Sequence, residues 1–291
     1  MKIKFLSFWL ILFLYSFVYS QETELNILTW NIQMLPNGPS IFSKDLRKLQ
    51  KVRLSKIIEH CNSAEYDIIV FQEVFDRELR RKLVRKLQKV YPYQIKTKTK
   101  FGRLTSNGVL IVSKVPLRYL DHVIYKKGVT ADAMAAKGCT LIEAEKNGVI
   151  FQIAGTHLQA GNSDEAIKHR YSQYQEIANL IHKYKIDTIP IFVIGDLNTK
   201  KSDTKVYQDM LKIIDVQDFP INDPEPFTID GKNSWNNHSN GIQLDYILLN
   251  PRKTSTQIIE QKILRLKFNY KQKNIDLSDH YGVKSKIIIK K

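Results

Sequence analysis

The sequence predicts an α/β fold, a four-layered sandwich in which two packed mixed β-sheets are flanked by helices. Short runs rich in strand-forming residues alternate with amphipathic helical patterns along the 291-residue chain. Adjacent hairpins are mixed with strand-helix units, which favours packed sheets over one doubly wound sheet. The chain has no repeat, low-complexity tract or flexible linker, so residues 21–291 are expected to form a single domain.

The first third of this domain contains two strand-helix units. Residues 24–32 alternate in polarity and are rich in strand formers, and a helix is expected over residues 43–60 with Ser43 as its N-cap. Residues 66–74 form a buried strand pattern. The basic segment 76–90 follows as an amphipathic helix, because its leucines repeat at helical spacing at positions 79, 83 and 87.

The rest of the domain alternates strands with one long helix. Residues 107–114 read as a strand, and residues 139–159 as two strands joined at Asn147 and Gly148, a dipeptide favoured in tight hairpin turns. A helix is expected over residues 164–184. Further strands are expected at residues 188–196, 242–250 and 281–290.

Residues 1–20 differ from the rest. Two lysines precede an apolar run of about fifteen residues that ends near Ser20, which is typical of a cleaved secretory signal peptide. An uncleaved anchor is the alternative, but the run is short for a membrane span. We therefore expect the domain to be secreted, to the extracellular space or the periplasm.

The domain is basic. Removal of the signal, which carries Lys2 and Lys4 and no acids, takes the formal charge from +16 to +14. This charge favours anionic partners without choosing between nucleic acid, anionic lipid and polyanions. The two cysteines, Cys61 and Cys139, could pair, but two buried thiols are at least as well supported by their helix and strand positions.

Residues with amide, carboxylate or imidazole side chains lie at the ends of five predicted strands. They are Asn31, Glu73, His157, the pair Asp196 and Asn198, and the pair Asp279 and His280. Strand ends can converge on one cleft in layered α/β folds. Carboxylate and amide oxygens suit a hard cation such as Mg²⁺, and histidines supply acid and base near neutral pH.

The stretch "IFVIGDLN" illustrates the pattern. Gly195 lets the strand turn without a side chain in the way, and Asp196 and Asn198 would point to the same side of an extended segment. Taken alone, the motif would more often be a polar turn. The site interpretation depends on five such ends in one chain.

The motifs "LTWNIQMLP", "VFQEVFD", "GVLIVSK", "GTHLQAG", "IGDLNT", "LDYILL" and "SDHYGV" resemble the endonuclease/exonuclease/phosphatase superfamily in order and spacing. "MLP", "EVFD" and "GTHLQ" are most similar to its secreted bacterial neutral sphingomyelinase branch. The resemblance covers almost all of residues 21–291. It implies a DNase I-like fold and a secreted, Mg²⁺-dependent phosphodiesterase that hydrolyses sphingomyelin.

The resemblance also implies a metal site. Glu73 matches the glutamate that binds the divalent cation, and Asn31 the asparagine that helps to hold metal and phosphate. Asp196 and Asn198 match the pair that positions phosphate, nucleophile and metal, and Asp279 belongs to the terminal "SDH" motif. The cofactor implied is Mg²⁺, with Mn²⁺ or Co²⁺ as substitutes.

Three further residues are implied to act in catalysis, together with Asp196 and Asn198. His280 matches the general base, Asp245 the aspartate that orients it, and His157 the histidine that stabilises phosphoryl oxygens or assists the leaving group. The other five histidines, His60, His122, His169, His182 and His238, are expected to be surface or packing residues.

Other features bear on the substrate. Relatives of this branch often carry a membrane-entering aromatic hairpin before "SDH", where this chain offers only Phe268 and Tyr270, which would serve there or pack a strand. The loops 129–137 and 158–170 lack the cysteines of the family disulfide, so we expect a more open site. Trp235 is expected in the core, with a place in the cleft as the alternative.

The partners expected are membrane sphingomyelin or another choline phospholipid, and the chain is expected to be a monomer. The basic charge and the weak hairpin leave a second interpretation open, a secreted metal-dependent endonuclease with the same catalytic residues acting on nucleic acid. An inositol-polyphosphate phosphatase and a non-catalytic membrane-binding protein are less favoured. The sequence does not determine the headgroup preference.

Overall fold

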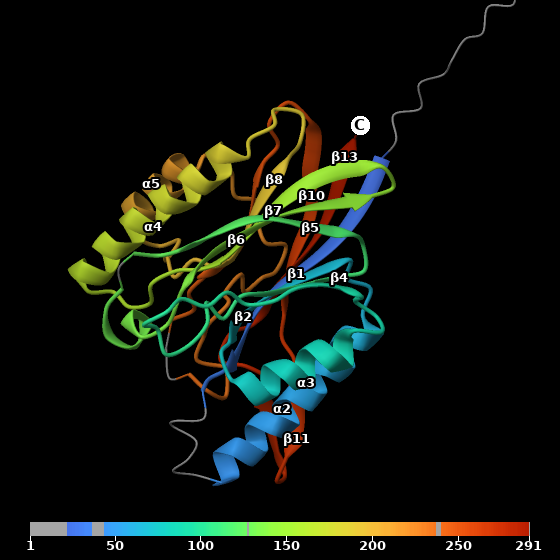
Figure 1. Ribbon diagram of the computed structural model, residues 1–291. Helices are drawn as coiled ribbons and strands as arrows, with labels where there is room; N and C mark the ends of the chain where they lie inside the picture. The colour runs from blue at the N-terminus through green and yellow to red at the C-terminus, as the bar shows by residue number, and fades with distance from the viewer. Residues whose placement is uncertain (1–21, 37–43, 127, 237–239, 291) are drawn as a thin grey trace, which may run out of the picture.

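The structure is a computed structural model that describes residues 22–36, 44–126, 128–236 and 240–290 (Figure 1). The predicted signal peptide and the predicted N-cap Ser43 lie outside these residues, as does His238. No helix in the described residues is long and apolar enough to cross a membrane.

Two β-sheets form the centre of the molecule. The six-stranded sheet has the order β10 (Ser255–Leu264), β13 (Gly282–Lys290), β1 (Glu22–Met34), β2 (Ile68–Val74), β4 (Leu110–Ser113) and β3 (Tyr93–Ile95). The five-stranded sheet has the order β5 (Leu117–Ile124), β6 (Gly138–Lys146), β7 (Val149–His157), β8 (Ile191–Asp196) and β9 (Asp245–Asn250). A separate hairpin joins β11 (Lys267–Tyr270) to β12 (Lys273–Asp276).

Helices cover the outer face of each sheet (Figure 1). Helices α2 (Lys44–Ser63) and α3 (Arg77–Leu87) pack on the six-stranded sheet, and α4 (Asp164–Lys183) and α5 (Thr204–Ile214) on the five-stranded sheet. A single turn of 3-10 helix, η1, spans Thr130–Ala133. The predicted four-layered α/β sandwich is confirmed.

The sheets face each other through an apolar core to which both contribute. Ile27 and Val70 of the first sheet pack there with Ile153, Ile194 and Ile247 of the second. Burying a side chain of this size stabilises the fold by about 1.5–3 kcal/mol. Because side chains alternate along a strand, every second residue of these strands faces the space between the sheets.

The expected strands and helices are all present, but several elements were not expected. They are helix α5, the strands β3, β5 and β10, and the hairpin of β11 and β12. Cys61 and Cys139 are both unpaired and buried, so the interpretation as two buried thiols is confirmed. Burial raises the pKa of the Cys61 thiol to about 12.

An irregularity in β1 and β2 changes the direction of two side chains. The parallel register runs regularly to Asn31 and Gln72, then shifts by one residue before Met34 and Val74. Gln33 and Glu73 have φ values of 49° and 56° in this stretch. Bulges of this kind redirect side chains beside active sites.

Gly195 is required by the packing of β8 against β7. Its φ is 149°, and a Cβ atom there would lie 1.9 Å from the carbonyl oxygen of Thr156. Replacement of Gly195 by alanine is therefore expected to destabilise the protein by at least ~3 kcal/mol.

Urea unfolding of Gly195→Ala measures this cost, and Gly148→Ala is the matched control. Gly148 has a φ of 72°, but a Cβ atom added there would meet no other atom within 4 Å, so its replacement should cost only about 1 kcal/mol of left-handed backbone strain. Equal losses in the two variants would contradict the clash at Gly195.

Candidate active site

The inner-face residues at the ends of five strands meet at one edge of the inter-sheet core. Asn31, His157, Asp196 and Asp245 share the inward-facing register of β1, β7, β8 and β9, and His280 precedes β13. All five are buried. Glu73 and Asp279 are half-buried at the same place, where their carboxylates and the charges of Lys137 and His280 influence one another.

Asp196 lies at the centre of this group. Its Oδ2 accepts a hydrogen bond from Asn31 Nδ2 at 3.0 Å and lies 3.4 Å from His157 Nε2 and 3.9 Å from His280 Nε2. Burial raises the pKa of Asp196 to about 6, with a further contribution from Asp245. A carboxylate held this way is stabilised by any added cation.

Asn198 does not continue β8 as an extended segment. Its φ is 47°, so the expectation that Asp196 and Asn198 would project from the same side of an extended strand is wrong. Instead the Asn198 backbone N–H donates to Asp196 Oδ1 at 3.0 Å, and its Nδ2 donates to the carbonyl of Leu158 at 3.1 Å. The turn thereby holds Asn198 next to the His157 segment.

His280 and Asp245 form a buried pair. His280 Nδ1 lies 2.8 Å from Asp245 Oδ2, which fixes the ring direction and leaves Nε2 on the side of Asp196. Burial would lower the pKa of His280, but the carboxylates of Asp245 and Asp196 outweigh it and raise that pKa well above its usual value. The other Asp245 oxygen, Oδ1, is buried without a hydrogen-bond partner among the described residues.

His157 has a contrasting environment. The Lys137 Nζ lies 3.0 Å from His157 Nε2 and also donates to the carbonyl of Leu158 and to Asp132 Oδ2. Burial, with the positive charges of Lys137 and His280, lowers the pKa of His157 well below its usual value. His157 is therefore neutral. Nε2 faces both the Lys137 ammonium and, at 3.4 Å, the Asp196 carboxylate, while Nδ1 is buried without a hydrogen-bond partner among the described residues.

Glu73 and Asp279 form the acidic part of the site. Burial raises the pKa of Glu73 to about 7, and the nearby Asp279 adds to this effect. Asp279 Oδ2 accepts a hydrogen bond from Gln33 Nε2 at 2.7 Å, so the redirected Gln33 positions one acid while the redirected Glu73 supplies another.

The donor set fits a divalent cation. Glu73, Asp196 and Asp279 offer carboxylate oxygens and Asn31 offers an amide oxygen, the ligands that Mg²⁺ prefers. Ligand atoms of Asp196, Asp245 and His280 also lie within 4.8 Å of one another, so the buried pair adjoins the acidic group directly. Burial, and after it repulsion from Asp279 and Asp245, raises the pKa values of Glu73 and Asp196, and a cation here would offset that repulsion.

The sequence did not single out Lys137, Gln33 or Arg53. Arg53 is buried and donates to the carbonyls of Ile32 and Leu277 at 3.0 and 2.7 Å, which ties β1 to the segment before Asp279. Burial lowers the pKa of Arg53 to about 10. The signal for Lys137 was present in the hairpin register: β6 and β7 pair Lys146 with Val149, which places Lys137 opposite Leu158.

The two loops without cysteines are tied by hydrogen bonds instead. Asp132 Oδ2 accepts from Lys137 Nζ and from the Ala160 backbone N–H, each at 2.8 Å, and the Val129 N–H donates to Gln159 at 2.9 Å. Polar contacts therefore join these loops where the family resemblance implies a covalent link.

The expectation of a core position for Trp235 is wrong, whereas Phe268 and Tyr270 take the second of their two expected roles and pack a strand. Trp235 is half-buried rather than in the core and lines a hollow of about 160 Å³ with Gln33, Leu35 and Arg53. Phe268 is buried, and Tyr270 packs beside it on the same apolar cluster, so both pack the hairpin.

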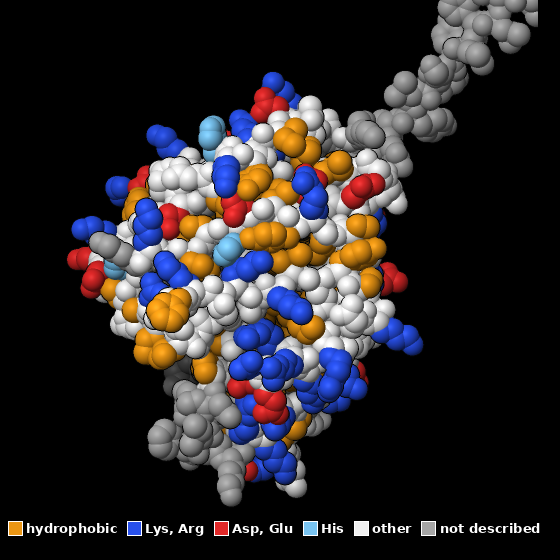
Figure 2. All heavy atoms as spheres, in the orientation of Figure 1, with side chains coloured by type: hydrophobic (Ala, Val, Ile, Leu, Met, Phe, Trp, Pro, Cys, Tyr) orange, Lys and Arg blue, Asp and Glu red, His pale blue; other side chains and the backbone are white. Residues whose placement is uncertain are grey.

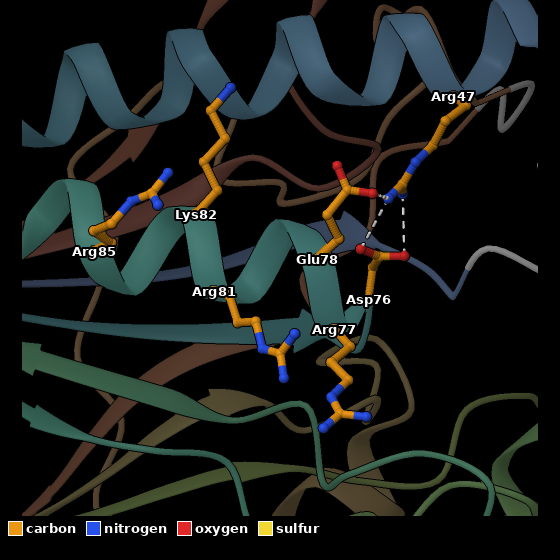
Figure 3. A pocket seen from close by; sticks show the side chains of 7 residues that line it. All are labelled: Arg47, Asp76, Arg77, Glu78, Arg81, Lys82 and Arg85. Carbon is orange, nitrogen blue, oxygen red and sulfur yellow. Dashed lines mark hydrogen bonds and ion pairs between the residues drawn. The ribbon is translucent and has the colours of Figure 1, made fainter.

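Positive charge borders the cleft. Helix α3 begins four residues after Glu73, and a hollow of about 530 Å³ between α2 and α3 is lined mainly by basic side chains (Figure 3). Figure 3 shows Arg47 reaching from α2 to Asp76, the α3 N-cap, and to Glu78, while Arg77 and Arg81 point away from α2. A basic border raises the local concentration of anionic substrates.

Comparison with known proteins identifies the family. Residues 28–280 match the model of the Endonuclease/Exonuclease/phosphatase family. The chain belongs to this family. The resemblance inferred from the motifs is confirmed.

Two characterised relatives are named for lipid substrates. The chain is 34% identical over 234 residues to Sphingomyelinase C of Leptospira interrogans, a match covering 73% of this chain and 40% of that protein. It is 28% identical over 307 residues to Phospholipase C of Staphylococcus aureus, covering 91% of this chain and 87% of that protein. The chain thus spans well under two thirds of the Leptospira relative.

Two solved structures of one protein, beta toxin, share the architecture of this chain. Beta toxin from Staphylococcus aureus superimposes with a TM-score of 0.76 at 25% identity, covering 90% of this chain and 99% of that one. A variant of beta toxin with bound magnesium ions gives a TM-score of 0.72 at 26% identity, with the same coverage.

The raised pKa of Glu73 predicts that cation binding depends on pH. If Glu73 is a ligand, a cation would bind its carboxylate and displace the proton, so Mg²⁺ affinity should rise from pH 6 to pH 8, through the pKa of about 7. The stabilisation of the melting temperature by millimolar Mg²⁺ at the two pH values measures this.

Glu73→Gln is the control. In the metal-free protein the ionised Glu73 is disfavoured by folding, so parent stability falls as pH rises from 4.5 through about 7. The Gln variant should be at least as stable as the metal-free parent at pH 8 and should gain nothing from Mg²⁺. Equal Mg²⁺ stabilisation of parent and variant would remove Glu73 from the cation site.

Proposed function

We propose that this protein is a Mg²⁺-dependent phosphodiesterase that hydrolyses sphingomyelin to ceramide and phosphocholine. The observation that carries the proposal is the convergence of an oxygen-rich acidic group on the buried His280 and Asp245 pair. The named substrates of the Leptospira and Staphylococcus relatives, and the magnesium ions in the beta toxin variant, support the lipid and the metal.

Roles for the residues follow from their contacts. Glu73, Asn31, Asp196, Asn198 and Asp279 would hold the metal and the phosphate. A Mg²⁺ ion held by these residues would offset charge on the phosphoryl and leaving oxygens and would weaken the negative potential of the carboxylates that keeps His280 protonated.

The proton transfers rest on the two histidines. His280 Nε2, aligned by Asp245 at Nδ1, removes a proton from the attacking water, which bonds to phosphorus as the bond to the ceramide oxygen breaks. His157, which is neutral and whose Nδ1 has no partner among the described residues, would contact a phosphoryl oxygen or the departing oxygen.

We also propose that residues 1–20 are removed as a signal peptide and that residues 21–291 act as one monomeric catalytic domain outside the cytoplasm. The apolar run after Lys2 and Lys4 supports the first part. The continuous core shared by both sheets supports the second.

Incubation of the purified protein with sphingomyelin vesicles, and separately with plasmid DNA, tests the substrate. Phosphocholine release is expected with Mg²⁺ and none with excess EDTA, while the plasmid stays intact. Nicked plasmid together with intact lipid would mean that the substrate is nucleic acid and that the same catalytic residues cleave it.

Loss of the proposed metal ligand Glu73, or of the proposed base His280, should abolish turnover. Glu73→Ala and His280→Ala are each expected to lower kcat by about 10³-fold or more, because one loses a metal ligand and the other the base. His182→Ala, an exposed position in the last turn of α4, is the matched control and should retain parent activity. A fully active Glu73→Ala protein would disprove the metal assignment.

Asp245→Asn tests orientation separately from proton transfer. The variant keeps the shape of the pair but loses the carboxylate that raises the pKa of His280, so kcat should fall roughly 10²-fold or more and the acidic limb of the pH profile should move to lower pH. An unchanged pH profile would mean that Asp245 does not act on the base.

A further inference from the structure

Three large apolar side chains are exposed on two neighbouring loops. Phe101 is 104% exposed, Leu104 80% and Met134 50%. The Leu104 N–H donates to the carbonyl of Met134 at 2.8 Å, and the Ala136 N–H donates to the carbonyl of Thr105 at 3.2 Å. The three residues therefore belong to one patch, which we term the apolar tip.

The apolar tip is held together by an arginine. The guanidinium of Arg103 donates to the carbonyl of Ala133 on the second loop, and also to the carbonyl of Lys126 at 3.4 Å. Gly102, between Phe101 and Arg103, has a φ of 80°, and a Cβ atom added there would meet only open space. Hydrogen bonds therefore join the two loops that carry the exposed side chains.

Positive charges surround the apolar tip. Segment 96–105, "KTKTKFGRLT", carries four basic residues and no acid. The acid of the second loop, Asp132, is paired with Lys137 at 2.8 Å. Figure 2 shows exposed hydrophobic side chains beside lysine and arginine side chains on the side of the molecule where these loops lie in Figure 1. Apolar groups ringed by cations suit a membrane interface with anionic lipid.

The apolar tip is joined to the candidate active site through Lys137. Met134 stands three residues before Lys137, whose Nζ lies 3.0 Å from His157 Nε2. Asp132 connects Lys137 to the Ala160 backbone on the opposite loop. Insertion of the tip would therefore bring the His157 side of the cleft to the lipid surface.

The β11 and β12 hairpin does not offer an equivalent surface. Phe268 is 8% exposed and packs with Leu277 and α2 in the outer core, with Tyr270 against it. The residues of this hairpin that are exposed are polar.

We propose that Phe101, Leu104 and Met134 insert into the surface of a phospholipid bilayer containing anionic lipid and orient the cleft toward it. The purpose of this contact rests on the proposed function, since a lipid phosphodiesterase must reach headgroups in the bilayer. The contact itself is independent of catalysis and can be measured without turnover.

Co-sedimentation with vesicles of sphingomyelin, phosphatidylcholine and phosphatidylserine, in EDTA, tests the contact. The variant Phe101→Ala/Leu104→Ala/Met134→Ala should partition about 10-fold more weakly or worse than the parent, because it loses the apolar area that enters the lipid. The variant Ile186→Ala/Ile259→Ala removes side chains that are 46% and 52% exposed elsewhere and should bind like the parent. Melting temperatures check that both variants fold.

Phe101→Trp provides a direct probe. Its emission should shift to shorter wavelength on addition of the same vesicles, because the new indole enters an apolar environment. No shift while the protein binds, binding of the triple variant equal to that of the parent, or failure of the parent to bind would each overturn the proposal. Conversion of a dimer to a monomer by the triple substitution with unchanged vesicle binding would assign the tip to a second copy and overturn it too.

The two proposals fail separately. Parent protein that binds vesicles through the tip but releases no phosphocholine with Mg²⁺ would contradict the proposed function alone. Parent protein that releases phosphocholine, with a triple variant that still binds vesicles fully, would contradict the tip alone.

Discussion

The contact between the inner faces of the two sheets determines where the candidate active site can form. Ile27, Val70, Ile153 and Ile194 bury the centre of this contact, and the alternation of side chains carries the same face outward to the strand ends. Asn31, His157, Asp196 and Asp245 therefore arrive at one edge without any loop having to place them. The apolar core beneath them also removes water, which strengthens every electrostatic interaction above it.

The stronger electrostatic interactions also cost stability, because several acidic side chains lie together at this edge. Glu73, Asp196, Asp245 and Asp279 repel one another in a poorly solvated place, and the pKa values of Glu73 and Asp196 rise to about 7 and 6 in consequence. The protein supplies partial compensation through His280, Lys137 and Arg53. Acids that repel one another at neutral pH favour the binding of a cation, so the same burial that costs stability would also favour a bound metal.

The sequence predicted the four layers and the strand ends because both depend on local patterns of polarity. It did not predict β5 and β10, whose residues are mostly half-buried at sheet edges and so lack an apolar run. The position of Lys137 follows from the Asn147–Gly148 hairpin register, which places it opposite Leu158. The direction of Glu73 was not available: it depends on a shift between β1 and β2, a long-range property that residues 66–74 do not encode by themselves.

The positions of the two thiols affect how readily they are oxidised. Cys61 and Cys139 lie at opposite outer faces of the sandwich, each in the apolar layer beneath a different helix pair. Neither is exposed. A thiol that is buried and held in its protonated form reacts slowly with oxidants and with other thiols. These two thiols are therefore expected to stay reduced in an oxidising environment as well as in a reducing one.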